Sequence, residues 1–201
     1  LDSLSSSGLF FPKFYIPWVS TSRSVFTMFT GIPDVSRKTS SRNPILRDQY
    51  SIISQFKEYE KYYMIGGSAS WANIRSLVSY NIKDMRLIEM ENINRSRVDV
   101  WGISDLDLFR EGNTILDNRV SSSPSFTIIQ TAGNHRPYTI PSDDSGFEKK
   151  QVEKSVLKAA GFKSEEQYNA VRLLDHSVGQ FFKMARESSY YENTVFVLFG
   201  D

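Results

Sequence analysis

The sequence contains no cysteine, which excludes disulfide bonds and any mechanism that depends on a thiolate. It contains two histidines, His135 and His176, so imidazole chemistry is limited to two positions. No apolar run approaches the roughly 20 residues that a membrane-spanning helix needs, and the first residues lack the pattern of a signal peptide. The formal net charge of +1 gives no global electrostatic reason to expect nucleic-acid binding.

What is present suits one folded domain. The 201 residues are 40% hydrophobic, which is enough for one sizeable core, so we expect a single domain spanning residues 1–201. The chain opens within a short amphipathic helical pattern at 1–7 and stops directly after the apolar run 194–199. A natural terminus seldom falls at the end of a buried strand, so we expect this domain to be truncated at both ends.

Short apolar runs alternate with helical patterns along the chain, which predicts an α/β fold with a mainly parallel sheet and helices on both faces. Ligands in such sheets bind beyond the carboxyl ends of the strands, which selects Thr21, His135 and Asp201 as site candidates expected to share one cleft. The predicted strands are 62–65, 87–90, 126–131 and 193–199, with an irregular aromatic strand at 9–18. The predicted helices are 21–29, 49–59, 71–78, one starting at Ser104 and a long one after Ser164, with a polar loop at 34–43.

Thr21 lies where several hydroxyl side chains crowd a predicted helix N-terminus, next to Ser20 and Ser22. The free backbone N–H groups and the helix dipole there favour an anion such as phosphate. A threonine hydroxyl is a poor nucleophile at neutral pH, but a bound divalent cation would lower its pKa. The alternative is an ordinary hydroxyl cap of the helix, because serine and threonine caps are common.

Asp201 and His135 each follow a predicted strand. Asp201 comes after Gly200 at the mouth of an apolar strand, a typical place for a metal ligand, although a turn residue would look the same. His135 stands beside Arg136 in a polar loop, where it could bind phosphate or donate a proton to a leaving oxygen; a solvated loop histidine is the alternative. His176 falls within the long amphipathic helix, and we interpret it as structural.

Gly66 and Gly67 allow a tight turn from a strand into the segment that carries Trp71. Trp71 could form an apolar wall for a ligand or could belong to the core. The segment is no nucleotide-binding phosphate loop, because the lysine and the glycine spacing of that motif are missing.

Together these motifs resemble the lipoteichoic-acid-synthase (phosphoglycerol transferase) branch of the sulfatase and alkaline phosphatase superfamily, over nearly the whole chain. In sulfatases the nucleophile precedes a Thr-Gly pair by nine residues, and Thr21 stands nine residues before Thr30-Gly31. The matching segments are Ser20-Thr21-Ser22-Arg23-Ser24, Met28-Phe29-Thr30-Gly31, Tyr63-Met64-Ile65-Gly66-Gly67, Trp71-Ala72-Asn73, Trp101-Gly102-Ile103-Ser104-Asp105, Thr131 to Tyr138, and Tyr191 to Asp201.

The resemblance implies an alkaline-phosphatase-like three-layer sandwich and a set of residue roles. Thr21 would be nucleophile and metal ligand, Asp201 a metal ligand, and His135, Trp71 and Asn73 substrate-binding residues. The cofactor would be a divalent metal ion, manganese in the first place, with magnesium or zinc as alternatives. Two family ligands have no counterpart here, an acidic residue that would precede Leu1 and a histidine after Asp201, so we expect the chain alone to bind metal weakly and to be inactive.

The resemblance also implies a reaction and a location. It implies transfer of phosphoglycerol, or a related phospho-alcohol, from a phospholipid through a phosphothreonine intermediate to a glycan or glycerol-phosphate acceptor. The parent would be anchored in a bacterial cell membrane by preceding helices, with the catalytic domain outside the cytoplasm.

Two alternatives remain open at this point. One is a phosphodiesterase or sulfatase-like hydrolase of the same fold, although formylglycine cannot be made from the threonine at position 21. The other is a catalytically decayed domain that binds a glycan or a lipid headgroup. Ser68 and Ala72 stand where many relatives have aspartate, which affects the details of substrate binding.

Overall fold

The computed structural model describes residues 1–17, 19–34 and 47–201, and the described part forms an α/β domain around one sheet. All its strands run parallel in the order β2-β1-β3, which confirms the predicted parallel sheet. The strands are β1 (Glu60–Ile65), β2 (Met85–Ile88) and β3 (Ser125–Gln130). The α-helices are α1 (Asp2–Ser5), α2 (Thr21–Thr30), α3 (Ile74–Asn81), α4 (Asp105–Asp117), α5 (Lys154–Ala159) and α6 (Glu165–Glu187). The short 3₁₀ turns are η3 (Ile52–Gln55), η4 (Trp71–Asn73), η5 (Met90–Asn92) and η6 (Tyr191–Asn193).

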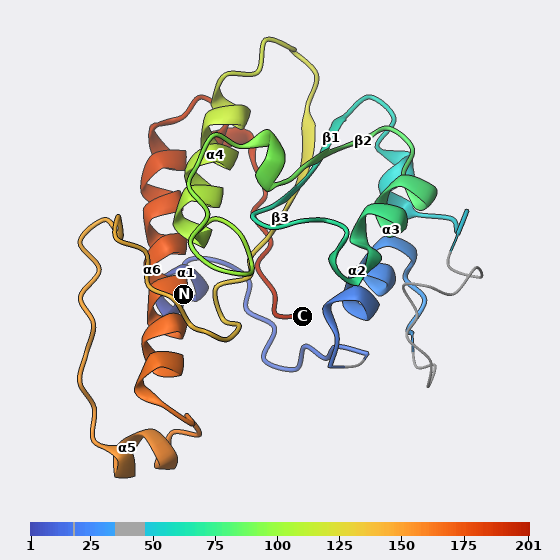
Figure 1. Cartoon of the computed structure of the whole chain (residues 1–201). Helices are drawn as coiled ribbons and strands as arrows, with labels where there is room; N and C mark the ends of the chain where they lie inside the picture. The colour runs from blue at the N-terminus through green and yellow to red at the C-terminus, as the bar shows by residue number, and fades with distance from the viewer. Residues whose placement is uncertain (18, 35–46) are drawn as a thin grey trace.

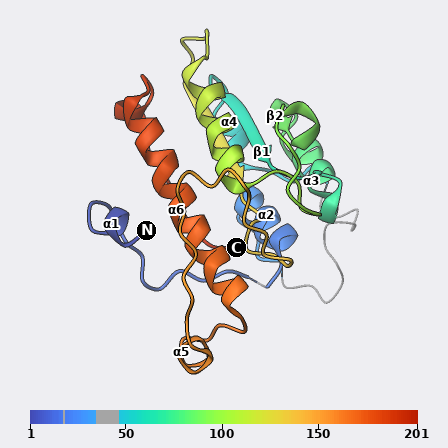
Figure 2. The ribbon, with the colours of Figure 1, turned by 60° about the vertical axis from the view of Figure 1, so that its left-hand side comes forward.

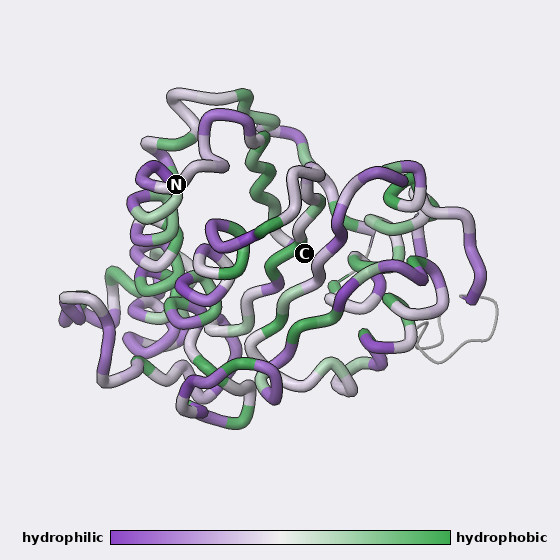
Figure 3. Tube along the Cα trace, turned by 90° about the horizontal axis from the view of Figure 1, so that it is seen from above, coloured by the Kyte–Doolittle hydropathy of each residue, from purple (hydrophilic) through white to green (hydrophobic). Residues whose placement is uncertain are grey.

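Helices cover both faces of the sheet, as predicted, so the domain has three layers (Figure 1). Successive residues of β1 point to opposite faces because side chains alternate along a strand. Tyr63 packs with α2 and α3 on one face, whereas Met64 packs with Leu108 of α4 on the other. Figure 2 shows β1 and β2 between α4 on one side and α3 on the other. Hydrophobic residues gather along the strands in the middle of Figure 3, which places the core there.

The two capped helices begin where the sequence predicts. The Ser104 hydroxyl accepts a hydrogen bond from the Asp107 N–H at the start of α4, and the Ser164 hydroxyl accepts one from the Gln167 N–H at the start of α6. Such caps satisfy backbone donors that have no partner within the helix. Both helices therefore have a fixed start, and α4 begins next to the carboxyl ends of the strands.

Two predicted strands do not form among the described residues. Residues 9–17 have no strand, and residues 193–199 contain the end of η6 followed by irregular backbone. Phe196 packs against Phe181 and Phe182 of α6, but Val195 is 89% exposed. An apolar pattern supplies strand propensity only, and a strand also needs a hydrogen-bonded neighbour, which neither segment has here.

Some predicted helices are shorter or broken. The pattern at 49–59 yields the single turn η3, with Ile52 60% exposed. The helix predicted from Trp71 is interrupted, because Ala72 (φ 50°) and Asn73 (φ 58°) have left-handed backbones, and α3 starts only after them. Beyond Asp34, the predicted loop 34–43 lies outside the described residues. None of the described helices is both long enough and apolar enough to cross a membrane.

Candidate functional site

Thr21 is the first residue of α2, and its side chain is half-buried. The cap position belongs to Ser20, which has extended backbone angles and whose side chain makes no capping hydrogen bond. The interpretation of Thr21 as an ordinary helix cap is therefore wrong. Instead its hydroxyl stands in the first turn of a ten-residue helix, where the dipole and the backbone N–H groups favour negative charge.

Asp201 lies next to the same helical turn. The Ser24 hydroxyl donates a hydrogen bond of 3.0 Å to the backbone carbonyl oxygen of Asp201. Figures 1 and 2 both show the C-terminus close to α2. Burial, with a further contribution from the Asp201 carboxylate, raises the pKa of the Tyr63 phenol above its ordinary range, and that phenol donates a hydrogen bond to Gln130 Oε1. Asp201 is thus near the end of β3 as well as near Thr21.

The donors gathered here suit a hard cation only in part. A threonine hydroxyl and an aspartate carboxylate are oxygen ligands, which magnesium and manganese prefer. Within residues 1–17, 19–34 and 47–201, however, no group of three or more histidine, cysteine, aspartate or glutamate side chains could hold a metal ion. Thr21 and Asp201 alone could provide only part of a coordination sphere, so their role as metal ligands stays a prediction.

His135 belongs to an aromatic cluster beyond the end of β3. Its ring stacks on Trp101, with 4.3 Å between the ring centroids, and Trp71 meets Trp101 edge-on at 5.5 Å. The indole Nε1 of Trp101 donates a hydrogen bond of 2.6 Å to the carbonyl oxygen of Arg136, so the loop is fixed beside the ring. His135 remains exposed, and its accessible ring can meet a ligand from solvent.

Trp71 and Asn73 sit on the turn that follows β1. Trp71 is 40% exposed, so its interpretation as a core residue is wrong, and its role as an apolar wall for a ligand stays a prediction. The buried Glu89 carboxylate accepts a hydrogen bond of 2.9 Å from the Ala69 N–H and pairs with Arg75, which holds this turn in place. η4 also packs against α2, so the Trp71 turn and the Thr21 helix are neighbours.

The structure thus brings the candidates together in two groups. Thr21 shares a helical turn with the residue that binds Asp201, and His135 shares an aromatic cluster with Trp71. None of these contacts joins His135 directly to Thr21 or to Asp201. The expectation of one cleft for all three residues remains a prediction.

Sequence reasoning missed the buried carboxylates that hold the two loops. Glu89 supports the Trp71 turn, and Asp105 accepts hydrogen bonds from the Ala132 and Gly133 N–H groups at the start of the His135 loop. Asp105 gave no distinctive signal in the sequence, because the helix dipole already explains an acidic residue in the first turn of a helix.

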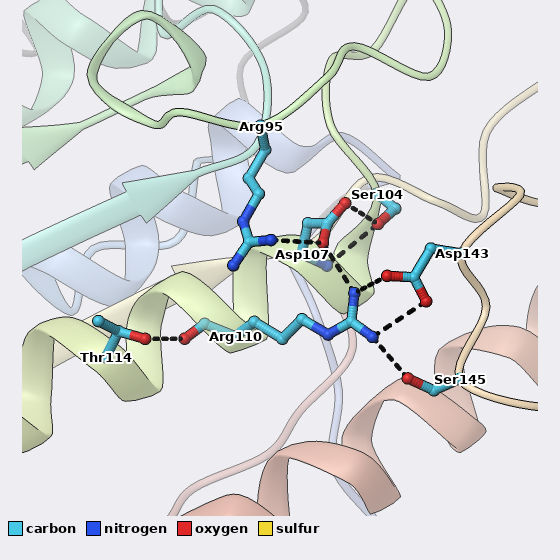
Figure 4. Close-up of polar contacts among 7 residues, drawn as sticks. All are labelled: Arg95, Ser104, Asp107, Arg110, Thr114, Asp143 and Ser145. Atoms are coloured by element: carbon cyan, nitrogen blue, oxygen red, sulfur yellow. Dashed lines mark hydrogen bonds and ion pairs between the residues drawn. The ribbon is translucent and has the colours of Figure 1, made fainter.

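A cluster of charged residues attaches the far end of the same loop to α4 (Figure 4). The Arg110 guanidinium donates hydrogen bonds to both oxygens of Asp143, at 2.7 and 3.2 Å, and to the Ser145 hydroxyl at 2.6 Å. It also donates to Asp107, which lies 3.9 Å from Arg95. The guanidinium holds the pKa of Asp143 below its usual range. The loop that carries His135 is therefore bound to α4 at two places, near its start through Asp105 and further along through Arg110.

The fold and these strand-end loops define an α/β domain of the alkaline phosphatase type. A protein of that superfamily from Vibrio parahaemolyticus superposes with a TM-score of 0.69 and 25% sequence identity, over 87% of this chain and 41% of that one. The family model described as "Sulfatase" matches residues 1–201. The chain belongs to the sulfatase family.

Curated relatives and further solved structures point to one branch of this family. The lipoteichoic acid synthase of Staphylococcus saprophyticus is 22% identical over 96% of this chain, and lipoteichoic acid synthase 1 of Bacillus subtilis is 22% identical over 85%. The chain spans 29% and 26% of the lengths of these two relatives.

Two solved structures share the fold at lower identity. The lipoteichoic acid synthase LtaP of Listeria monocytogenes has a TM-score of 0.70 at 17% identity, over 86% of this chain and 41% of that one. The phosphoglycerol transferase GacH of Streptococcus pyogenes, solved with sn-glycerol-1-phosphate, has a TM-score of 0.53 at 15% identity, over 85% and 45%. These findings support the resemblance noted in the sequence. Enzymes of this superfamily generally use divalent metal ions.

Proposed function

We propose that this chain is part of the catalytic domain of a metal-dependent phosphoglycerol transferase. The observation that carries the proposal is the position of Thr21, which stands half-buried in the first turn of α2, one turn before the residue that binds Asp201. The relatives named as lipoteichoic acid synthases and as a phosphoglycerol transferase support this choice of reaction.

In the proposed reaction the Thr21 hydroxyl oxygen attacks the phosphorus of a phospholipid headgroup. A bond forms between that oxygen and phosphorus, the bond from phosphorus to the lipid glycerol oxygen breaks, and the hydroxyl proton passes to solvent while the departing oxygen gains one. The helix N-terminus at Thr21 favours the phosphate charge. His135 is suited to bind the phosphoryl group or to give a proton to the departing oxygen, since it is exposed in the loop after β3. In the second step a glycan or glycerol-phosphate hydroxyl oxygen bonds to the phosphorus of the phosphothreonine intermediate, the bond from phosphorus to the Thr21 oxygen breaks, and the acceptor's proton is transferred to Thr21.

The metal belongs to this proposal. Manganese, magnesium or zinc, when bound, would lower the pKa of the attacking hydroxyl and offset charge on the phosphoryl group. Thr21 and Asp201 would be among its ligands, and oxygen donors of this kind suit manganese and magnesium without excluding zinc.

The substrates imply a location for the whole protein. A phospholipid donor is accessible to an enzyme held at a membrane surface, so we propose that the full-length protein works at a bacterial cell membrane with this domain outside the cytoplasm. Trp71 and Asn73, on the turn beside α2, would contact the substrate.

The test is mass spectrometry of the full-length protein after exposure to phospholipid vesicles and manganese. We expect a phosphoglycerol adduct on the peptide that contains Thr21, lost in Thr21→Val, which keeps the branched shape without the hydroxyl, and retained in Thr21→Ser. Turnover by Thr21→Val at the normal rate would refute the nucleophile assignment. Release of the group to water with every acceptor offered would favour a hydrolase of the same fold, and binding without any adduct would favour the decayed domain.

A further inference from the structure

We infer that Asp105 is a positioning residue, whose carboxylate orients the loop that carries His135. Asp105 is the first residue of α4, and only 8% of it is exposed. Its Oδ1 accepts a hydrogen bond of 2.8 Å from the Ala132 N–H, and its Oδ2 accepts one of 2.9 Å from the Gly133 N–H.

The two hydrogen bonds of Asp105 fix both the position and the orientation of the loop backbone at Ala132 and Gly133. Each carboxylate oxygen binds one of two consecutive N–H groups, so the loop backbone cannot rotate about a single bond. The connection then passes to the histidine, because the His135 N–H donates to the Ala132 carbonyl oxygen at 3.2 Å. Ala132 therefore connects the two residues, because its N–H binds the Asp105 carboxylate and its carbonyl oxygen binds the His135 N–H.

The carboxylate is not needed to start the helix. Ser104 already caps α4 by accepting from the Asp107 N–H at 3.0 Å, whereas the Asp105 oxygens are directed to the loop. Burial raises the pKa of Asp105 above its usual value, and the Ala132 and Gly133 N–H groups oppose this increase. The helix dipole favours a carboxylate in this first turn, but both Asp105 oxygens are hydrogen-bonded to the loop, which is the contact that compensates for their burial.

The loop also fits closely around the carboxylate. A Cβ atom added to Gly133 would lie 2.6 Å from Asp105 Oδ2, closer than real side chains approach. On its other side the loop rests on Trp101, which stacks on the His135 ring and binds the Arg136 carbonyl oxygen. Asp105 thus holds the loop backbone on one side, and Trp101 supports the imidazole on the other.

The experiment uses NMR of the two imidazole rings, since His135 and His176 are the only histidines. Stacking on Trp101 should give the His135 ring protons an upfield ring-current shift, and His176, which meets Phe147 at 5.7 Å between ring centroids, gives a separate reference signal. In Asp105→Ala and in Gly133→Ala we expect this shift to be lost while the His176 signals stay unchanged. Asn169→Ala is the matched control, because Asn169 is a buried side chain that binds the backbone of Lys150, far along the same segment.

Three results would overturn the inference. The first is an unchanged His135 signal in Asp105→Ala. The second is an equal change in Asn169→Ala, which would mean general loosening of the segment. If Asp105→Ala does not fold, Gly133→Ala decides, because it keeps the carboxylate and displaces only the loop; an unchanged His135 signal there is the third.

The catalytic meaning of this inference rests on the proposed role of His135. In the full-length enzyme, Asp105→Asn should lower kcat by roughly 10- to 100-fold with little change in KM, because a small displacement of a catalytic group has an effect of that size. The NMR result does not depend on activity. Lost stacking together with full activity would reject the role of His135 and leave the positioning intact, whereas retained stacking rejects the positioning alone.

Discussion

Replacing Gly102 by alanine should destabilise the protein severely and disrupt the aromatic cluster at the site. Gly102 has φ of +118°, a conformation that residues with a side chain rarely adopt. It also packs directly on the turn after β1: an added Cβ would clash with the Gly66 carbonyl oxygen and would lie 2.7 Å from the Gly67 Cα. Both neighbours are backbone atoms, which cannot rotate away.

The expected loss of stability has two causes, the unfavourable backbone angle and the steric clash. A residue held at such a backbone angle costs about 1–3 kcal/mol. The clash with backbone adds to this cost because the Gly66-Gly67 turn is also bound by the Ile103 N–H and by the Met90 N–H. We therefore expect a loss of about 3–5 kcal/mol in the free energy of unfolding, against about 5–15 kcal/mol in total for a typical domain.

The assay is urea unfolding of the chain followed by circular dichroism, with the melting temperature as a second measurement. For a domain of this size 1 kcal/mol corresponds to about 2–4 °C, so the melting temperature should fall by roughly 6–20 °C. Gly179→Ala is the control. Gly179 lies within α6, an added Cβ there meets no described atom within 4 Å apart from the backbone of its own helix and its chain neighbours, and alanine should stabilise the helix by about 0.5–1 kcal/mol.

We therefore expect Gly102→Ala to lower the free energy of unfolding and Gly179→Ala to raise it. A loss below about 1 kcal/mol in Gly102→Ala would show that the turn can rearrange, and the reasoning from backbone geometry would be refuted. Because Trp101 adjoins Gly102, the His135 stacking signal should also change in Gly102→Ala and persist in Gly179→Ala.

Three other measurements test separate parts of the structure. Ser164→Ala removes the cap on the Gln167 N–H and should reduce the free energy of unfolding by about 1 kcal/mol in urea titrations; no loss would show that the cap is dispensable. Arg110 lowers the pKa of Asp143, so the stabilisation from this pair should be complete above the ordinary aspartate pKa of about 3.9 and disappear as pH falls through the lowered value; a carboxyl ¹³C titration with an ordinary or raised midpoint would contradict this. His135→Ala should greatly reduce turnover of the full-length enzyme while leaving the melting temperature nearly unchanged, since the ring is exposed; a misfolded variant with normal activity per folded molecule would make the role structural.

The sequence identified the elements with strong local signals. Ser104 and Ser164 mark the starts of α4 and α6, and the apolar run 62–65 falls within β1. The predictions were wrong where a segment needed a neighbouring strand to pair with, or where its backbone departed from the helical pattern. Residues 193–199 have the apolar content of a strand but no ladder, and Ala72 with Asn73 breaks the helical spacing by adopting left-handed angles.

At the candidate site, residue types were predictable and their supports were not. Of the three candidates only His135 follows a strand of the structure, β3, because the strands predicted before Thr21 and before Asp201 do not form. The partners of Asp105 lie 27 and 28 positions away in the chain, and no local pattern specifies them.

The amino-acid sequence by itself determined the α/β class, the capped helices and the hydroxyl at the start of α2, because these depend on propensities and on contacts within a few residues. Only the tertiary structure decided that Trp71 is exposed, that His135 stacks on Trp101, and that buried carboxylates hold the loops. Those features arise where distant segments meet, and a buried carboxylate selects its partners from whichever backbone N–H groups the fold brings to it.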